Sequence, residues 1–194
     1  MKPLKAVLLA LVVSIARQAS ADSIATDDIT IVPGSSIAGV SLGPNGLQEL
    51  KKLGKPYRTN RGMSQTRQVW KWSRPEGRLD TFFVHTVNNG VIDAKPADGV
   101  TIDLIRSTVA RFKTSGGIGV SSTLDEIRKN FPDVAPVDGT PTIFDDLKRG
   151  IAFEFSSAPI GHSVCIAVMV HPQSQRNIAT QEQVAEVLEH GSKE

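Results

Sequence analysis

The sequence predicts an α+β protein built as a tandem repeat, in which each unit has a short helix packed on an antiparallel β-sheet. Three observations support this fold class. Runs with period-two alternation are separated by turns rich in Gly, Pro and Asn. Two short stretches with helical spacing each follow a Gly- and Ser-containing turn and precede hairpin strands. The two stretches begin at Leu47 and Leu124, 77 positions apart, which indicates an internal duplication.

The first 21 residues have the form of a secretory signal peptide. Lys2 and Lys5 precede an apolar run over residues 6–16, and Ala19-Ser20-Ala21 gives the small-residue pattern that a signal peptidase cuts. The run is shorter than the roughly 20 residues that span a bilayer, so we expect no integral membrane segment in the mature chain. We therefore expect cleavage after Ala21, a flexible leader over residues 22–30, and a soluble protein that is periplasmic or secreted.

Loss of this segment changes the charge of the protein. The whole chain has 22 basic and 20 acidic residues and a formal net charge of +2. The segment holds three basic residues and no acidic one, which leaves 19 basic residues against 20 acidic residues. A net charge near zero gives no general attraction for nucleic acid or anionic lipid, so we expect no nucleic-acid partner.

The first repeat is expected over residues 31–112 and begins with a short strand at Ile31-Val32. Its helix is indicated by three leucines at three-residue spacing, followed by a glycine and a proline that end it. These residues are Leu47, Leu50, Leu53, Gly54 and Pro56. A basic loop over residues 58–67 then leads into the strands.

Strands of the first repeat are predicted from alternating apolar and polar residues. They cover residues 68–72, 79–87, 91–94 and 100–104, with residues 109–112 as an extension of the last strand. Asn89-Gly90 is the strongest hairpin signal in the chain, because a type I′ turn needs positive φ at both of its central residues.

The second repeat is expected over residues 113–173. Thr123 and Glu126 form a capping box at the start of its helix, because each side chain satisfies a free backbone N–H of the first turn. Its predicted strands cover residues 142–147, 151–155 and 164–170. A C-terminal helix and tail over residues 174–194 follows, with a second capping box formed by Thr180 and Gln183.

Chemistry that depends on cysteine, metal or cofactor finds little support. Cys165 is the only cysteine and lies in an apolar run, so we expect a buried, inert thiol and no intramolecular disulfide. The four histidines are far apart in sequence, whereas a closed zinc site needs four ligands and a catalytic one needs three. We therefore expect no metal and no cofactor.

Two segments of the chain resemble a known family of exported proteins. They are residues 37–56, with the phrase Ile37-Ala38-Gly39-Val40, and residues 113–127, with Gly117-Ile118-Gly119-Val120. They look like the β-lactamase-inhibitor-protein-like repeat and the related small α/β domain of outer-membrane assembly lipoproteins of the SmpA/BamE type. The resemblance covers roughly residues 31–170. It implies a helical element packed on an antiparallel sheet, export across the inner membrane, and action by protein–protein contact without catalysis.

The two tryptophans of the chain, Trp70 and Trp72, alternate onto one face of a predicted strand. Two interpretations remain open, because period two does not say which face of a sheet is covered. The rings either fill the core beneath the short helices or form an open aromatic surface that binds a partner. In the second case polar residues nearby would form its rim. The rim residues are Tyr57, Arg67, Lys71 and His85.

The main functional hypothesis is an exported protein-binding module that acts through an exposed sheet face and has no catalytic residues. Its partner would be another exported or cell-envelope protein, and an inhibitor, an immunity factor or an envelope-associated factor all fit. The alternative is a periplasmic or secreted hydrolase acting on cell-wall or glycan substrates. In that alternative, acids such as Asp103 and Asp145 would carry out acid–base chemistry.

Overall fold

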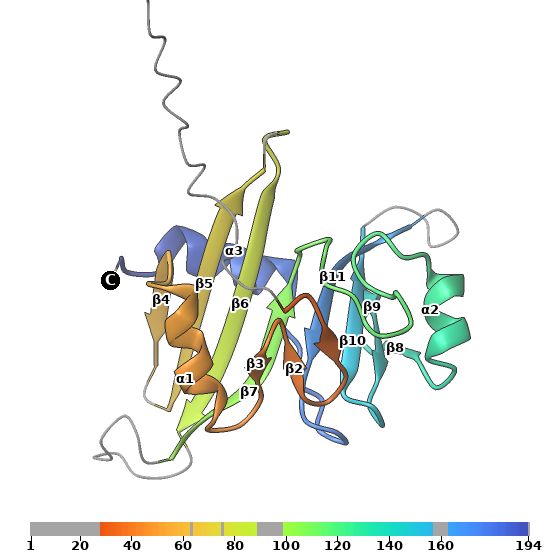
Figure 1. Cartoon of the computed structure of the whole chain (residues 1–194), viewed down its shortest axis with the longest axis horizontal. Coiled ribbons are helices and arrows are strands. Elements are labelled where there is room, and N and C mark those ends of the chain that lie inside the picture. Colours follow the sequence, from red (N-terminus) through yellow and green to blue (C-terminus); the bar gives the residue numbers. More distant parts are fainter. Residues whose placement is uncertain (1–27, 63, 75, 89–98, 157–162, 194) are drawn as a thin grey trace, which may run out of the picture.

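The computed structural model describes residues 28–62, 64–74, 76–88, 99–156 and 163–193. These residues form a mixed protein of strands and helices, which confirms the α+β class (Figure 1). The main element is one eight-stranded sheet with the order β4-β5-β6-β7-β11-β10-β9-β8. The predicted signal peptide, most of the leader, the Asn89-Gly90 turn and the strand at residues 91–94 lie outside the described residues.

Every neighbouring pair of strands in the large sheet is antiparallel. Its strands are β4 (Arg58–Arg61), β5 (Gln65–Ser73), β6 (Leu79–Asn88), β7 (Val100–Ser107), β8 (Ala135–Val137), β9 (Thr140–Asp146), β10 (Ile151–Phe155) and β11 (Cys165–Val170). The strands predicted from alternation therefore coincide with β5, β6, β7, β9, β10 and β11. The longest pairing joins strands β5 and β6, whose register runs without a shift from Gln65 opposite Val87 to Ser73 opposite Leu79.

A small sheet and the helices cover the two faces of the large sheet (Figure 1). The small sheet consists of β1 (Ile31–Val32), β2 (Ser36–Ile37) and β3 (Val40–Ser41). The helices are α1 (Gly46–Leu50) with the 3-10 turn η1 (Lys51–Leu53), α2 (Leu124–Asn130) and α3 (Gln181–His190). The predicted stop after the leucine stripe is confirmed, because Gly54 follows η1 with a φ of +74°, which favours glycine.

Apolar side chains pack on both faces of the large sheet. One core, which includes Ile127 of α2 and Leu50 of α1, lies beneath the small sheet, α1 and α2. A second core, which includes Val184 and Val187, lies between the sheet and α3 on the opposite face. Burial of apolar area on both faces stabilises the sheet by roughly 25 cal/mol for each Å² removed from water.

Both predicted capping boxes are confirmed. At the start of α2, Glu126 N–H donates to Thr123 Oγ1, and Thr123 N–H donates to the Glu126 carboxylate at 2.8 Å. At the start of α3, Thr180 and Gln183 make the same reciprocal pair of bonds. Side chains therefore satisfy backbone donors at the start of each helix that would otherwise lack partners.

Three sequence expectations need correction. The basic loop expected over residues 58–67 contains β4, whose Thr59 pairs with β5 on one side and exchanges two backbone hydrogen bonds with Ser192 on the other. Residues 109–112 do not extend β7; they form a turn that buries Val109 and Phe112 in the first core. The edge strand β8, which contains Pro136, was not expected.

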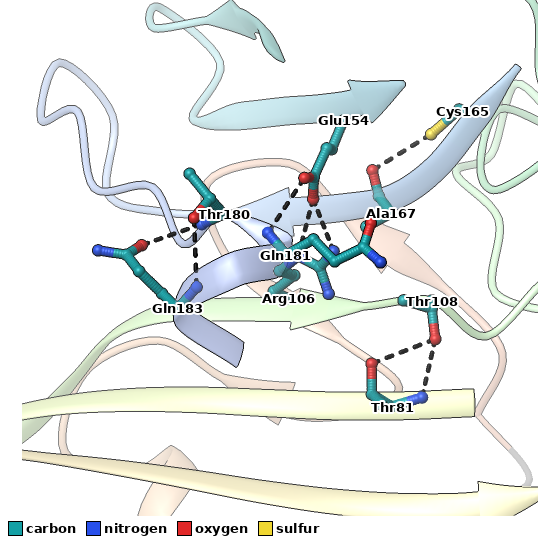
Figure 2. Close-up of polar contacts among 9 residues, drawn as sticks. All are labelled: Thr81, Arg106, Thr108, Glu154, Cys165, Ala167, Thr180, Gln181 and Gln183. Atoms are coloured by element: carbon teal, nitrogen blue, oxygen red, sulfur yellow. Dashed lines mark hydrogen bonds and ion pairs between the residues drawn. The ribbon is translucent and has the colours of Figure 1, made fainter. Parts of the chain in front are cut away.

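A buried ion pair connects the large sheet with α3 (Figure 2). Arg106 of β7 is 2% exposed and donates from Nη2 to Glu154 Oε2 of β10 at 2.6 Å. The other carboxylate oxygen of Glu154 accepts the backbone N–H of Gln181, the first residue of α3, at 3.1 Å. One carboxylate thus neutralises a buried cation and binds the positive end of a helix dipole.

We predict that Glu154→Gln lowers the free energy of unfolding by about 3–5 kcal/mol, because it leaves the Arg106 charge buried without a counter-charge. Chemical denaturation measures this change. The matched control is Glu182→Gln, in the first turn of α3 but exposed, which changes the stability by less than about 1 kcal/mol. Equal losses in the two variants would contradict the role given to the ion pair.

Candidate functional site: a groove beside α1

A groove with a volume of about 1010 Å³ lies between α1 and the large sheet. Its walls come from α1 and η1, from the segment over residues 54–56, and from the turn between β4 and β5. Its floor comes from β5, β6 and the first residue of β7. It is large enough for an extended peptide or a small molecule.

Helix α1 is held at both ends over the sheet, and this leaves the groove along its side. At its start, a Cβ on Gly46 would lie 1.8 Å from the carbonyl oxygen of Ser41, so only glycine allows this approach. Glu49 also accepts the backbone N–H of Ser41 at 3.0 Å. Beyond its end, Trp70 Nε1 donates to the carbonyl oxygen of Gly54 at 3.0 Å.

The floor of the groove mixes polar and apolar groups. Thr66, Gln68 and Trp70 lie on the same face of β5, and Thr86 of β6 stands opposite Thr66. The Trp70 ring packs edge-on against Phe82 beneath this floor, with ring centroids 6.5 Å apart. A ligand here meets hydroxyl and amide groups along the strands and apolar surface from the leucines of α1.

Basic residues border the groove. Lys51, Lys55 and Arg61 line it and are exposed, and none of the described residues that line it is acidic. Positive side chains around a partly enclosed cavity produce a positive potential that favours negatively charged ligands. The groove therefore suits a ligand that is partly apolar and carries negative charge.

A signal for this basic border is present in the sequence. Residues 50–75 contain eight basic residues and no acidic residue. The prediction of a basic loop over residues 58–67 rests on some of these basic residues. It does not say that they lie beside a helix. The position of Lys51 and Lys55 next to the sheet depends on how α1 packs, which the charge pattern does not encode.

The six residues of the predicted partner surface fall on opposite faces of the sheet. Trp70 and Trp72 face α1, and Trp70 is only 4% exposed, so its ring belongs to the core. Arg67 stands opposite His85 in the strand pairing, and Arg67 Nη1 lies 3.9 Å from Glu186 of α3. A single aromatic surface with these polar residues as its rim is therefore absent from the described residues.

Tyr57 and Lys71, two further residues of that prediction, contact each other. Lys71 Nζ lies 3.5 Å from the centroid of the Tyr57 ring. The hydrogen bond from Lys71, together with its positive charge, lowers the pKa of the Tyr57 hydroxyl. The guanidinium group of Arg58 lies 4.7 Å from the centroid of the same ring. The Tyr57 ring therefore makes cation–π contacts with two side chains of the same protein.

The two acids of the hydrolase alternative lie on the α3 face, on different parts of the sheet. Asp103 of β7 accepts from Asn177 at 3.1 Å and lies 2.7 Å from His85 Nδ1. The Asp145 side chain on β9 is 0% exposed and lies 3.0 Å from His171 Nε2 and 3.1 Å from Arg176 Nε. Each acid has a histidine partner, and together these contacts fix the segment that precedes α3.

Cys165 is 1% exposed, and burial raises the pKa of its thiol to about 12. The expected burial of this thiol is confirmed. Within the described ranges, no three His, Cys, Asp or Glu side chains are grouped so that they could hold a metal ion. No helix among these same residues is both long and apolar enough to cross a bilayer.

Comparison with known proteins assigns no family. No protein-family model and no curated protein sequence matches the chain. A similar solved structure is the crystal structure of the uncharacterized protein YfeY from Escherichia coli. The two chains are 15% identical, and the similarity covers 74% of this chain and 99% of that chain with a TM-score of 0.33.

We predict that the protein loses stability as the pH rises through the neutral range. Burial alone would lower the pKa of His171, but its hydrogen bonds to Asp145 and the Pro172 carbonyl and the Asp145 charge outweigh burial and raise it. A raised pKa in the folded state stabilises the protein below the unfolded pKa of about 6.5, and this contribution is lost above the folded pKa.

Denaturant unfolding at a series of pH values measures this loss. The variant His171→Gln should be less stable at acidic pH and should show a smaller decrease as the pH rises. The exposed residue His190 provides the control, since His190→Gln should keep the decrease of the unmodified protein. A His171→Gln variant with an unchanged pH profile would contradict the assignment.

Proposed function

We propose that this protein is an exported binding protein that holds an extended, acidic segment of another exported or cell-envelope protein in the groove beside α1. The observation that carries the proposal is that the described residues lining the groove include Lys51, Lys55 and Arg61 and no acidic residue. The location rests on the signal-peptide pattern of the first 21 residues. The proposed mode of action is contact with the partner, without catalysis.

The shape of the groove favours an extended segment over a flat protein surface. The groove runs between a helix and strands, and its lining extends from Pro44 before α1 to Asn88 at the end of β6. A segment lying there could alternate its side chains between the apolar wall near Leu47 and the basic border. Electrostatic attraction would speed the encounter and select acidic partners, and the apolar contacts would hold the complex.

We also infer that the chain contains two copies of one unit. In support, α1 is followed by four strands, β4 to β7, and α2 is followed by four strands, β8 to β11. The two sets meet through their last strands, because β7 pairs with β11. This order fits the resemblance to the β-lactamase-inhibitor-protein-like repeat and agrees with a protein that works by contact.

The hydrolase alternative has weaker support from the structure. Asp145 is enclosed between His171 and Arg176, and Asp103 between His85 and Asn177. Strands β11 and β10 separate the strands that carry these two acids. Two carboxylates on either side of a glycosidic bond would need to lie within about 5–10 Å of each other and face the same opening.

We predict that a fluorescent peptide of alternating Leu and Glu binds the protein, and that neutralising the basic border weakens this binding. The variant Lys51→Ser/Lys55→Ser/Arg61→Ser should raise the dissociation constant by about tenfold or more, since each lost charged contact costs on the order of 0.5–1 kcal/mol. Fluorescence anisotropy measures the change. Binding should weaken as salt is added.

A matched control removes three exposed cations elsewhere, Arg78, Lys129 and Lys148, by the same substitution and should bind as the unmodified protein does. A second measurement uses the variant Trp72→Phe, in which Trp70 is the only tryptophan. The fluorescence emission of Trp70 should change when the peptide binds, because Trp70 lines the groove. Equal weakening in both triple variants, or equal binding of a Leu and Lys peptide, would refute the groove as the binding site.

A further inference from the structure

A second cavity lies on the opposite face of the sheet. Its volume is about 220 Å³. Strands β5, β6 and β7 form one side, and the segment over residues 176–183, which leads into α3, forms the other. It is separate from the groove beside α1, and Gln65 is the one described residue that lines both.

Two arginines line the cavity wall. Arg67 and Arg176 lie there together with His85, and Asp103 is the one acidic residue among the described residues of the wall. Both carboxylate oxygens of Asp103 have partners within the wall, because Oδ1 lies 2.7 Å from His85 Nδ1 and Oδ2 accepts from Asn177. Asp103 is thus held by His85 and Asn177, whereas Arg67 and Arg176 pair with Glu186 and Asp145, which are not among the described residues of the wall.

Each of these side chains contacts another element. His85 Nε2 lies 2.8 Å from Gln65 Oε1, so both ring nitrogens face oxygen atoms. Arg176 donates from Nε to Asp145. The ion pair of Arg67 is long, because its Nη1 lies 3.9 Å from Glu186 Oε2. A planar guanidinium in this setting can bind two oxygens of one anion.

We propose that this cavity binds a small oxyanion, such as inorganic phosphate or a short dicarboxylate, through Arg67 with His85 and Arg176 beside it. The small volume of the cavity suits a small ligand, and the forked donors of Arg67 favour an oxyanion. The site is distinct from the groove, so loss of anion binding and loss of peptide binding are separate outcomes.

Two-dimensional ¹H–¹⁵N NMR tests the proposal. The unmodified protein is titrated with potassium phosphate or sodium succinate, and with sodium chloride at the same ionic strength as a control. Saturable shifts confined to Gln65, Asn177 and the backbone over residues 176–179 are expected with at least one oxyanion and absent with chloride. The arm that saturates identifies which oxyanion chemistry the cavity accepts.

Arg67→Gln should weaken the binding by about tenfold or more, because it removes the charge and the fork of donors. Arg67→Lys keeps the charge and should give an intermediate affinity, and its spectrum shows whether substitution at this position disturbs the fold. Lys148→Gln, on an exposed cation far from the cavity in sequence, should have no effect. Shifts that never saturate, that also occur with chloride, or that persist unchanged in Arg67→Gln would overturn the proposal.

Discussion

The buried pair between Arg106 and Glu154 sets the arrangement of the rest of the molecule. These residues lie on β7 and β10, and β11 runs between those two strands. Their charges are stable in the interior only while they face each other, because an unpaired buried ion costs several kcal/mol. Glu154 also binds the first N–H of α3, so the same interaction positions the helix that covers this face. The central strands and α3 are therefore held in one geometry.

Coverage of both faces explains why several strands show no alternation in burial. Residues 81–84 of β6 are all buried, as is the whole of β10, because one set of side chains faces α1 and α2 and the other faces α3. The alternation of side chains along a strand shows which residues share a face, but it does not show what covers that face. The sequence therefore placed Trp70 and Trp72 on one face correctly, whereas the burial of Trp70 depends on where α1 packs, which is a tertiary property.

The elements that could be predicted have strong local signals. Thr123 with Glu126 and Thr180 with Gln183 mark helix starts through bonds made within four residues. Strand β4 has the sequence Arg-Thr-Asn-Arg and no apolar residue, and it forms because its backbone pairs with β5 and with Ser192, which is 133 positions from Thr59. Likewise, the groove could not be predicted beyond its charge, since its walls come from segments that meet only in the folded chain.

The two helix-and-strand units differ in what lies beneath their short helices, and this difference explains where a groove can exist. Below α2, Phe131 packs on Phe153 with ring centroids 5.3 Å apart, and Phe144 packs on Phe155 at 5.4 Å, so aromatic rings fill the space. Beside α1, the strands present Thr66, Gln68 and Thr86, which are too short or too polar to fill it. Closing the groove against α1 would bury hydroxyl and amide groups that need partners. A groove with a polar floor therefore remains open to a ligand that supplies those partners.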